Sequence, residues 1–174
     1  DRAFFSERAK LLGSKVEFAD ATPEDTSAAF AKALPVVATG EIATARPAQP
    51  DETSASAALA SIRHAVDHVR AGRAGAVVTN PIAKSVLYRA GFRHPGHPEF
   101  LAELAANGGR PPQPVMMLWS PELAVVPVTI HLSLRQAITQ LSSELIVTTA
   151  RIAAADLKTR FGLARPRLAV SGLN

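Results

Sequence analysis

The chain has 174 residues, of which 47% are hydrophobic, and this length allows one domain or two small ones with a buried core. Because it contains no cysteine, disulfides, thiolate metal sites and cysteine nucleophiles are excluded. The net charge of +4 comes from scattered basic residues, and there is one Trp and one Tyr for base stacking, so we expect no nucleic acid partner.

No apolar run approaches the roughly 20 residues of a membrane span, and no signal pattern opens the chain. We therefore expect a cytoplasmic protein with no membrane partner. Because the chain begins without Met and stops just after an apolar run, we also expect it to be a fragment, incomplete at both ends.

The first part of the chain alternates helical and strand-like patterns. Helices are predicted over residues 1–12, 22–34 and 51–71, and strands over 15–19, 34–38 and 74–79. In the third helix Leu59, Ile62, Val66 and Val69 follow the spacing of one buried face. The alternation predicts α/β layers with a largely parallel sheet, and a first α/β domain over residues 1–92.

A central stretch combines several structural signals. Asn80 and Pro81 end the apolar run before them and open a helix to Ala90, which Gly91 ends. The loop at 94–99, with the sequence HPGHPE, then brings two histidines and a carboxylate together. Because binding groups concentrate on loops held by a rigid scaffold, we expect a site here.

The remainder is predicted to form a second α/β domain over residues 93–174. Helices are predicted over 99–106 and 143–161, and strands over 115–119, 123–130 and 168–171. The turn at Ser120, Pro121 and Glu122 predicts that the first two of these strands form an antiparallel pair.

Two histidines are candidates for chemistry. His97 with Glu99 could form an acid/base or ligand pair, or simply an exposed imidazole in a helix-capping turn. His131 follows an apolar β run and precedes a helix, and ligands collect beyond the carboxyl ends of strands in open α/β sheets. It could bind a divalent ion, or only hydrogen-bond to backbone.

Other candidates have weaker support. Lys84 could bind an anion at the end of the preceding predicted strand, or it could be solvated. Asn174 lies just after another predicted strand, at the start of the loop that follows. His64 and His68 lie four apart on a helix but away from its apolar face, so we interpret them as surface residues. The chain has neither the Rossmann glycine fingerprint nor a P-loop.

Four segments together resemble one family. They are VTNPIAK at 78–84, GHPEFLAE at 96–103, PVTIHLSL at 127–134 and AVSGLN at 169–174. In this order they are similar to the 4-hydroxythreonine-4-phosphate dehydrogenase family, also called PdxA, and cover a central part of its length.

The resemblance implies α/β/α layers like those of isocitrate and isopropylmalate dehydrogenases, with two domains flanking a cleft in a homodimer. Such folds bind NAD or NADP without the Rossmann motif. The family position of His131 is a ligand of a divalent metal (Zn, Mg or Co), and that of His97 binds substrate. Pro98, a further substrate-binding candidate, stands where the family has Thr, and proline cannot donate the hydroxyl hydrogen bond that Thr would. Lys84 and Asn174 are further substrate-binding candidates, while catalytic and cofactor-binding residues are unknown.

The implied function is metal- and NAD(P)-dependent oxidation of 4-phosphooxy-L-threonine, with decarboxylation to 3-amino-2-oxopropyl phosphate, in pyridoxal 5'-phosphate biosynthesis. The metal would stabilise the alkoxide that expels hydride to the nicotinamide. Two alternatives remain: a relative that oxidises another phosphorylated hydroxy acid or a cyclic diol, and a catalytically silent fragment or binding module. Because further family metal ligands lie beyond Asn174, we expect the 174-residue polypeptide alone to be inactive.

Overall fold

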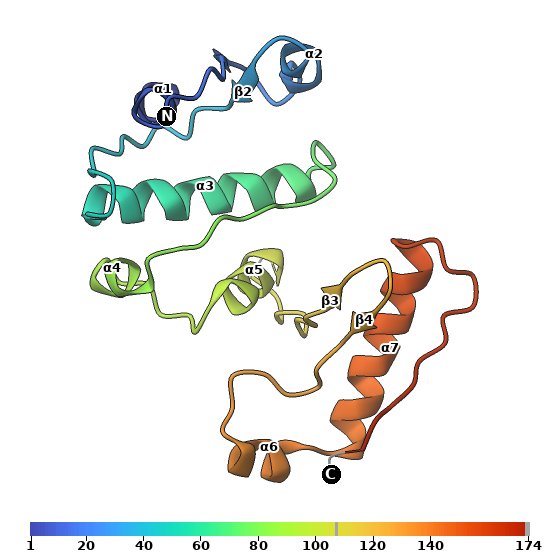
Figure 1. Cartoon of the computed structure of the whole chain (residues 1–174). Coiled ribbons are helices and arrows are strands. Elements are labelled where there is room, and N and C mark those ends of the chain that lie inside the picture. The colour runs from blue at the N-terminus through green and yellow to red at the C-terminus, as the bar shows by residue number, and fades with distance from the viewer. Residues whose placement is uncertain (107, 173–174) are drawn as a thin grey trace. The chain divides into compact units, whose positions relative to one another are not determined.

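A computed structural model describes residues 1–106 and 108–172 of the chain (Figure 1). It divides into two compact units, Asp1–Pro112 and Gln113–Asn174. The buried cluster of the first unit contains both Phe92 and Phe100. The chain therefore packs continuously across residues 92 and 93, and a domain boundary there in the whole protein stays a prediction.

The first unit combines helices with a short parallel sheet. Its elements are α1 (Arg2–Leu11), β1 (Phe18–Asp20), α2 (Thr26–Phe30), β2 (Leu34–Val36), α3 (Glu52–Arg70), α4 (Lys84–Arg89) and α5 (His97–Ala106). Strands β1 and β2 pair in parallel, with Phe18 opposite Leu34 and Asp20 opposite Val36. The predicted parallel pairing of these segments is confirmed.

Helix α3 is set by its first residues. The Asp51 side chain accepts from the Ser54 N–H, and the Ser54 hydroxyl lies 3.0 Å from the Asp51 N–H, which completes a capping box. Thr53 also donates to the Asp51 carboxylate, at 2.6 Å. The Thr53 hydroxyl, followed by the Ser54 N–H, lowers the pKa of Asp51 because both hydrogen bonds favour the charged form.

The main core of this unit lies where α3 packs against α4 and α5. Its buried residues are Ala55, Ile62, Val86, Leu87, Phe92 and Phe100. Leu87 is 2% exposed, and the rings of Phe92 and Phe100 meet edge to face at 5.1 Å. The predicted apolar face of α3 is confirmed at Ile62 and Val66, which are buried.

The second unit contains a hairpin and two helices. Its elements are β3 (Leu118–Trp119), β4 (Ala124–Val125), α6 (Leu134–Gln140) and α7 (Ser143–Thr159). Leu118 pairs with Val125 and Trp119 with Ala124, so the predicted antiparallel pair is confirmed, although it is shorter than predicted.

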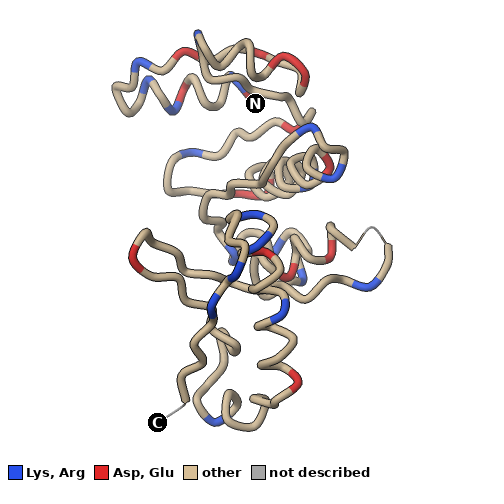
Figure 2. Tube along the Cα trace, turned by 90° about the vertical axis from the view of Figure 1, so that its right-hand side faces the viewer, with Lys and Arg blue, Asp and Glu red and all other residues tan. Residues whose placement is uncertain are grey.

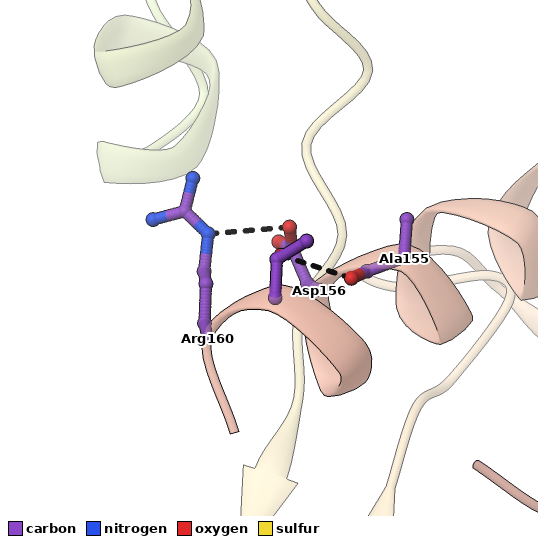
Figure 3. A network of polar contacts seen from close by, with 4 residues as sticks. Ala155, Asp156 and Arg160 are labelled. Carbon is purple, nitrogen blue, oxygen red and sulfur yellow. Dashed lines mark hydrogen bonds and ion pairs between the residues drawn. The ribbon is translucent and has the colours of Figure 1, made fainter. Parts of the chain in front are cut away.

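Local hydrogen bonds fix both ends of α7. The Ser142 hydroxyl accepts from the Leu145 N–H at 3.1 Å and caps the first turn. At the other end Thr159 donates to the Ala155 carbonyl and Arg160 Nε donates to Asp156 Oδ1 at 3.2 Å (Figure 3). The helix therefore ends two residues before the predicted Phe161.

Two predicted strands do not form. Residues 74–79 and 168–171 carry no strand assignment in the described chain, and Val78 and Val170 are 95% and 70% exposed. An apolar β-branched run becomes a strand only when a neighbour pairs with its backbone, and neither run has one among the described residues. The chain is thus mixed α/β, and the α/β/α layering around a cleft stays a prediction.

Charges are dispersed along the chain. Lys and Arg, and Asp and Glu, occur in both units (Figure 2). Within residues 1–106 and 108–172, no helix combines the length and apolarity needed to cross a membrane.

Candidate functional site

A cavity of about 210 Å³ lies in the first unit between α3 and the extended segment that precedes α4. One wall comes from α3, through Ala58, Ser61, Ile62 and Ala65, and the opposite wall from Val77, Val78, Thr79, Asn80, Pro81 and Ile82. His97 adds an imidazole. The cavity lining is therefore mixed, with polar residues Ser61, Thr79, Asn80 and His97 among apolar ones, and a few such polar groups can orient a small ligand.

His97 is the first residue of α5, two residues earlier than the predicted helix start. Pro98 and Glu99 follow it, and both residue types favour the first turn of a helix. The His97 side chain is half-buried, and its Nε2 is enclosed without a hydrogen-bond partner in the part of the chain that the structure describes. Because an enclosed polar nitrogen without a partner costs free energy, a ligand group that pairs with it would gain binding energy.

Lys84 lies beside the same loop. Its Nζ donates to the Pro95 carbonyl at 2.8 Å. A side-chain carbon built at Gly96 would lie 3.2 Å from Glu99 Oε2 and 3.9 Å from Lys84 Nζ. Lys84 and Glu99 therefore both approach Gly96, a buried residue that has no side chain to obstruct them.

His94, to which the sequence assigned no role, packs against aromatic side chains of the first unit. Its ring centroid lies 5.0 Å from those of both Phe92 and Phe100. Its Nδ1 lies 3.5 Å from Glu103 Oε2. The sequence does hold a signal for this role of His94. Phe92 and Phe100 lie on either side of the loop in the sequence, and both join the buried cluster, so the loop between them is held close to their rings.

His131 lies in the second unit and differs in its surroundings. It is exposed, its backbone has φ 56°, and it precedes α6, whose first turn is capped by Ser133 and Gln136. The β run before it ends as strand β4 at Val125. Asn174 falls outside the described residues, so its predicted role stays untested.

No complete metal site is present in the described chain. Over residues 1–106 and 108–172, no three His, Asp or Glu side chains gather closely enough to hold an ion. His64 is exposed, as predicted, whereas His68 has an enclosed Nε2 and accepts from Arg73 Nε at 3.2 Å through Nδ1. His68 is therefore a structural residue on α3.

The complete chain, residues 1–174, matches the family model described as pyridoxal phosphate biosynthetic protein PdxA. The chain belongs to the PdxA family. The resemblance carried by the four sequence segments is thereby confirmed.

Curated PdxA relatives are close in sequence. A 4-hydroxythreonine-4-phosphate dehydrogenase of Bradyrhizobium diazoefficiens is 74% identical over 165 residues, which cover 95% of this chain and 48% of the relative. One of Methylorubrum populi is 56% identical over 177 residues, covering 100% of this chain and 51% of the relative. The chain thus spans about half the length of the curated relatives it matches.

Solved PdxA structures share the fold. A 4-hydroxythreonine-4-phosphate dehydrogenase from Burkholderia phymatum superposes with a TM-score of 0.79 at 29% identity, over 96% of this chain and 49% of that one. The enzyme of the same name from Klebsiella pneumoniae gives a TM-score of 0.75 at 29% identity, over 91% and 48%. The mixed α/β arrangement is therefore that of PdxA structures.

Proposed function

We propose that the full-length protein containing this chain oxidises 4-phosphooxy-L-threonine with NAD or NADP, in pyridoxal 5'-phosphate biosynthesis. The family match and the names of the relatives support this assignment. In the proposed reaction the substrate hydroxyl loses a proton and its carbon loses hydride to the nicotinamide. The resulting β-keto acid releases carbon dioxide to give 3-amino-2-oxopropyl phosphate.

The observation that carries the proposal within this chain is that His97 lines the cavity and has a ring nitrogen, Nε2, without a hydrogen-bond partner among the described residues. An imidazole nitrogen can accept from a substrate hydroxyl or, when protonated, donate to a carboxylate. The Thr79 hydroxyl and the Asn80 amide line the same cavity and can orient a polar ligand. We assign His97 to substrate binding and leave the residue that receives the proton unassigned.

A divalent metal is a further part of the proposal. When bound, such an ion would stabilise negative charge on a substrate oxygen. His131 is exposed and can offer one imidazole, but the described residues do not bring two further ligands to it. We propose His131 as one ligand of a site completed by residues outside this chain. If so, His131→Ala should lower metal affinity by more than the roughly 10- to 100-fold typical of residues that only orient a ligand.

The remaining features rest on the family resemblance. We propose a cytoplasmic homodimer with the layered dehydrogenase fold and a cleft between two domains. We also expect the 174-residue polypeptide alone to be inactive, since it offers only one candidate metal ligand. Turnover by that polypeptide would contradict this expectation.

A second candidate follows from Pro98. It is half-buried beside Gly96, with Cδ 3.5 Å from the position of a side-chain carbon there, and it offers neither a hydroxyl nor an N–H. A substrate that needs a donor at this position would bind less well. The alternative is therefore oxidation of another phosphorylated hydroxy acid or a cyclic diol by the same fold.

The decisive experiment measures NAD- and NADP-linked turnover of the full-length protein on 4-phosphooxy-L-threonine and on those alternatives. His97→Ala should lower kcat/KM by about 10- to 100-fold, the effect of losing one hydrogen bond to a charged group. His64→Ala is the matched control, because His64 is an exposed histidine on the cavity-lining helix α3. Equal activity of His97→Ala and His64→Ala would overturn the role of His97, and turnover of only another substrate would select the second candidate.

A further inference from the structure

Helix α4 presents two side chains of one face to the loop that leads to His97. Lys84 and Tyr88 are four residues apart, a spacing that places them on the same side of the helix. Lys84 Nζ donates to the Pro95 carbonyl at 2.8 Å, and the Tyr88 hydroxyl donates to the neighbouring His94 carbonyl at 3.4 Å. Two consecutive loop carbonyls are therefore bound by two consecutive turns of α4.

We propose that Lys84 is a positioning residue, which holds the loop at residues 94–96 so that the His97 imidazole stays at the cavity. The charged hydrogen bond from Lys84 is the stronger of the two contacts, because the Tyr88 bond is long and neutral. Tyr88 assists. This inference rests on the proposed function only in the effect it assigns to turnover.

Three observations make this loop suited to such control. Helix α4 is anchored by Val86 and Leu87, which are 4% and 2% exposed, so the face opposite the core is held in place. Gly96 is buried and lies close to both Lys84 Nζ and Glu99 Oε2. Because glycine has no side chain, the main chain can pass close to the Lys84 ammonium at this point. His97 follows Gly96 directly, so a shift of the Pro95 carbonyl moves the start of α5.

The contact also explains why Lys84 need not bind substrate itself. Its ammonium is within hydrogen-bond distance of a main-chain oxygen of its own unit. A lysine used in this way affects ligand binding only through the residue that it positions. The role can therefore be separated from direct binding by experiment.

The first test measures accessibility of His97 without reference to activity. Diethyl pyrocarbonate modifies neutral imidazole, and the rate at each histidine of the full-length protein can be followed by peptide mass spectrometry. Lys84→Met keeps the hydrocarbon stem but removes the ammonium, and it should speed modification of His97 by about fivefold through local opening of the loop. Tyr88→Phe should have a smaller effect in the same direction.

Internal controls are available in the same sample. His64 is exposed, and its modification rate should not change in any variant. Lys32→Met removes the same charge from an exposed lysine outside the site. Lys84→Arg retains a charged donor and should restore slow modification of His97. An unchanged His97 rate in Lys84→Met would overturn the proposal.

The second test is a double-mutant cycle in turnover. Lys84→Met should lower kcat/KM by about tenfold in the wild-type background, as expected when a substrate-binding group is misplaced. In the His97→Ala background the same substitution should cost nothing further, because Lys84 acts through His97. A full loss in both backgrounds would mean that Lys84 contacts substrate, and would reject the positioning role. If the wild-type protein turns over none of the proposed substrates, the proposed function fails, while the modification rates still decide the role of Lys84.

Discussion

The two histidine-bearing segments of the molecule are built in contrasting ways. His97 lies at the start of a ten-residue helix, with one ring nitrogen enclosed, and its loop is hydrogen-bonded to α4. His131 is exposed, with a left-handed backbone, before the seven-residue helix α6, which has no buried residue. The first segment is organised by packing within its own unit, whereas the helix after His131 is capped by local side-chain hydrogen bonds of Ser133 and Gln136.

The largest effect on this comparison is expected from truncating a buried side chain of α4. Leu87→Ala should lower the free energy of unfolding by about 3 kcal/mol, because Leu87 is 2% exposed and its removal leaves a cavity. Leu12→Ala is the matched control: Leu12 is 83% exposed, and the same substitution should cost less than about 0.5 kcal/mol. Urea unfolding of the full-length variants measures both. Equal losses would show that α4 is not anchored as described.

A smaller effect is expected at His131, where the backbone rather than packing is under strain. With φ at 56°, a residue that has a Cβ is disfavoured and glycine is not. His131→Gly should therefore be more stable than His131→Ala by about 1 kcal/mol, measured by urea unfolding. Both variants remove the imidazole, so the comparison isolates the backbone. A less stable glycine variant would contradict the left-handed conformation.

The smallest effect is expected from the cap of α3, which forms one wall of the cavity. The folded state lowers the pKa of Asp51, so the charged form stabilises the protein above the pKa of the unfolded chain. This contribution should be lost as the pH falls through the lowered folded-state pKa. Asp51→Asn keeps a capping oxygen but removes the titration, so its stability should depend less on pH between neutral and strongly acidic solution. A steeper dependence in the variant would contradict the assignment.

Helices were predictable from the sequence because their signals are local. Asp51 and Ser142 both cap the helices that follow them, and α3 and α7 start within a residue of the expected positions. Strands were less predictable, since the run at 74–79 depends on a partner that the described chain does not supply. Family membership followed from four separated motifs, none of which needed the fold to be known.

The contacts around the candidate residues were not predictable from the sequence, and the roles of those residues stay predictions. The sequence offered His97 and Lys84 as candidates, but it did not indicate the hydrogen bond from Lys84 to the Pro95 carbonyl. A main-chain partner eleven residues away depends on how α4 packs, which spacing alone does not give. The contacts of the His94 ring with Phe92 and Phe100 were missed for the same reason.

The wall of the cavity formed by residues 77–82 has a thermodynamic consequence. This segment contributes to the cavity but forms no strand, and Val78 is 95% exposed. A molecule that occupies the cavity touches main chain that has little other support, so occupancy and local order are linked. The melting temperature of the protein should therefore rise with the logarithm of ligand concentration once the dissociation constant is exceeded.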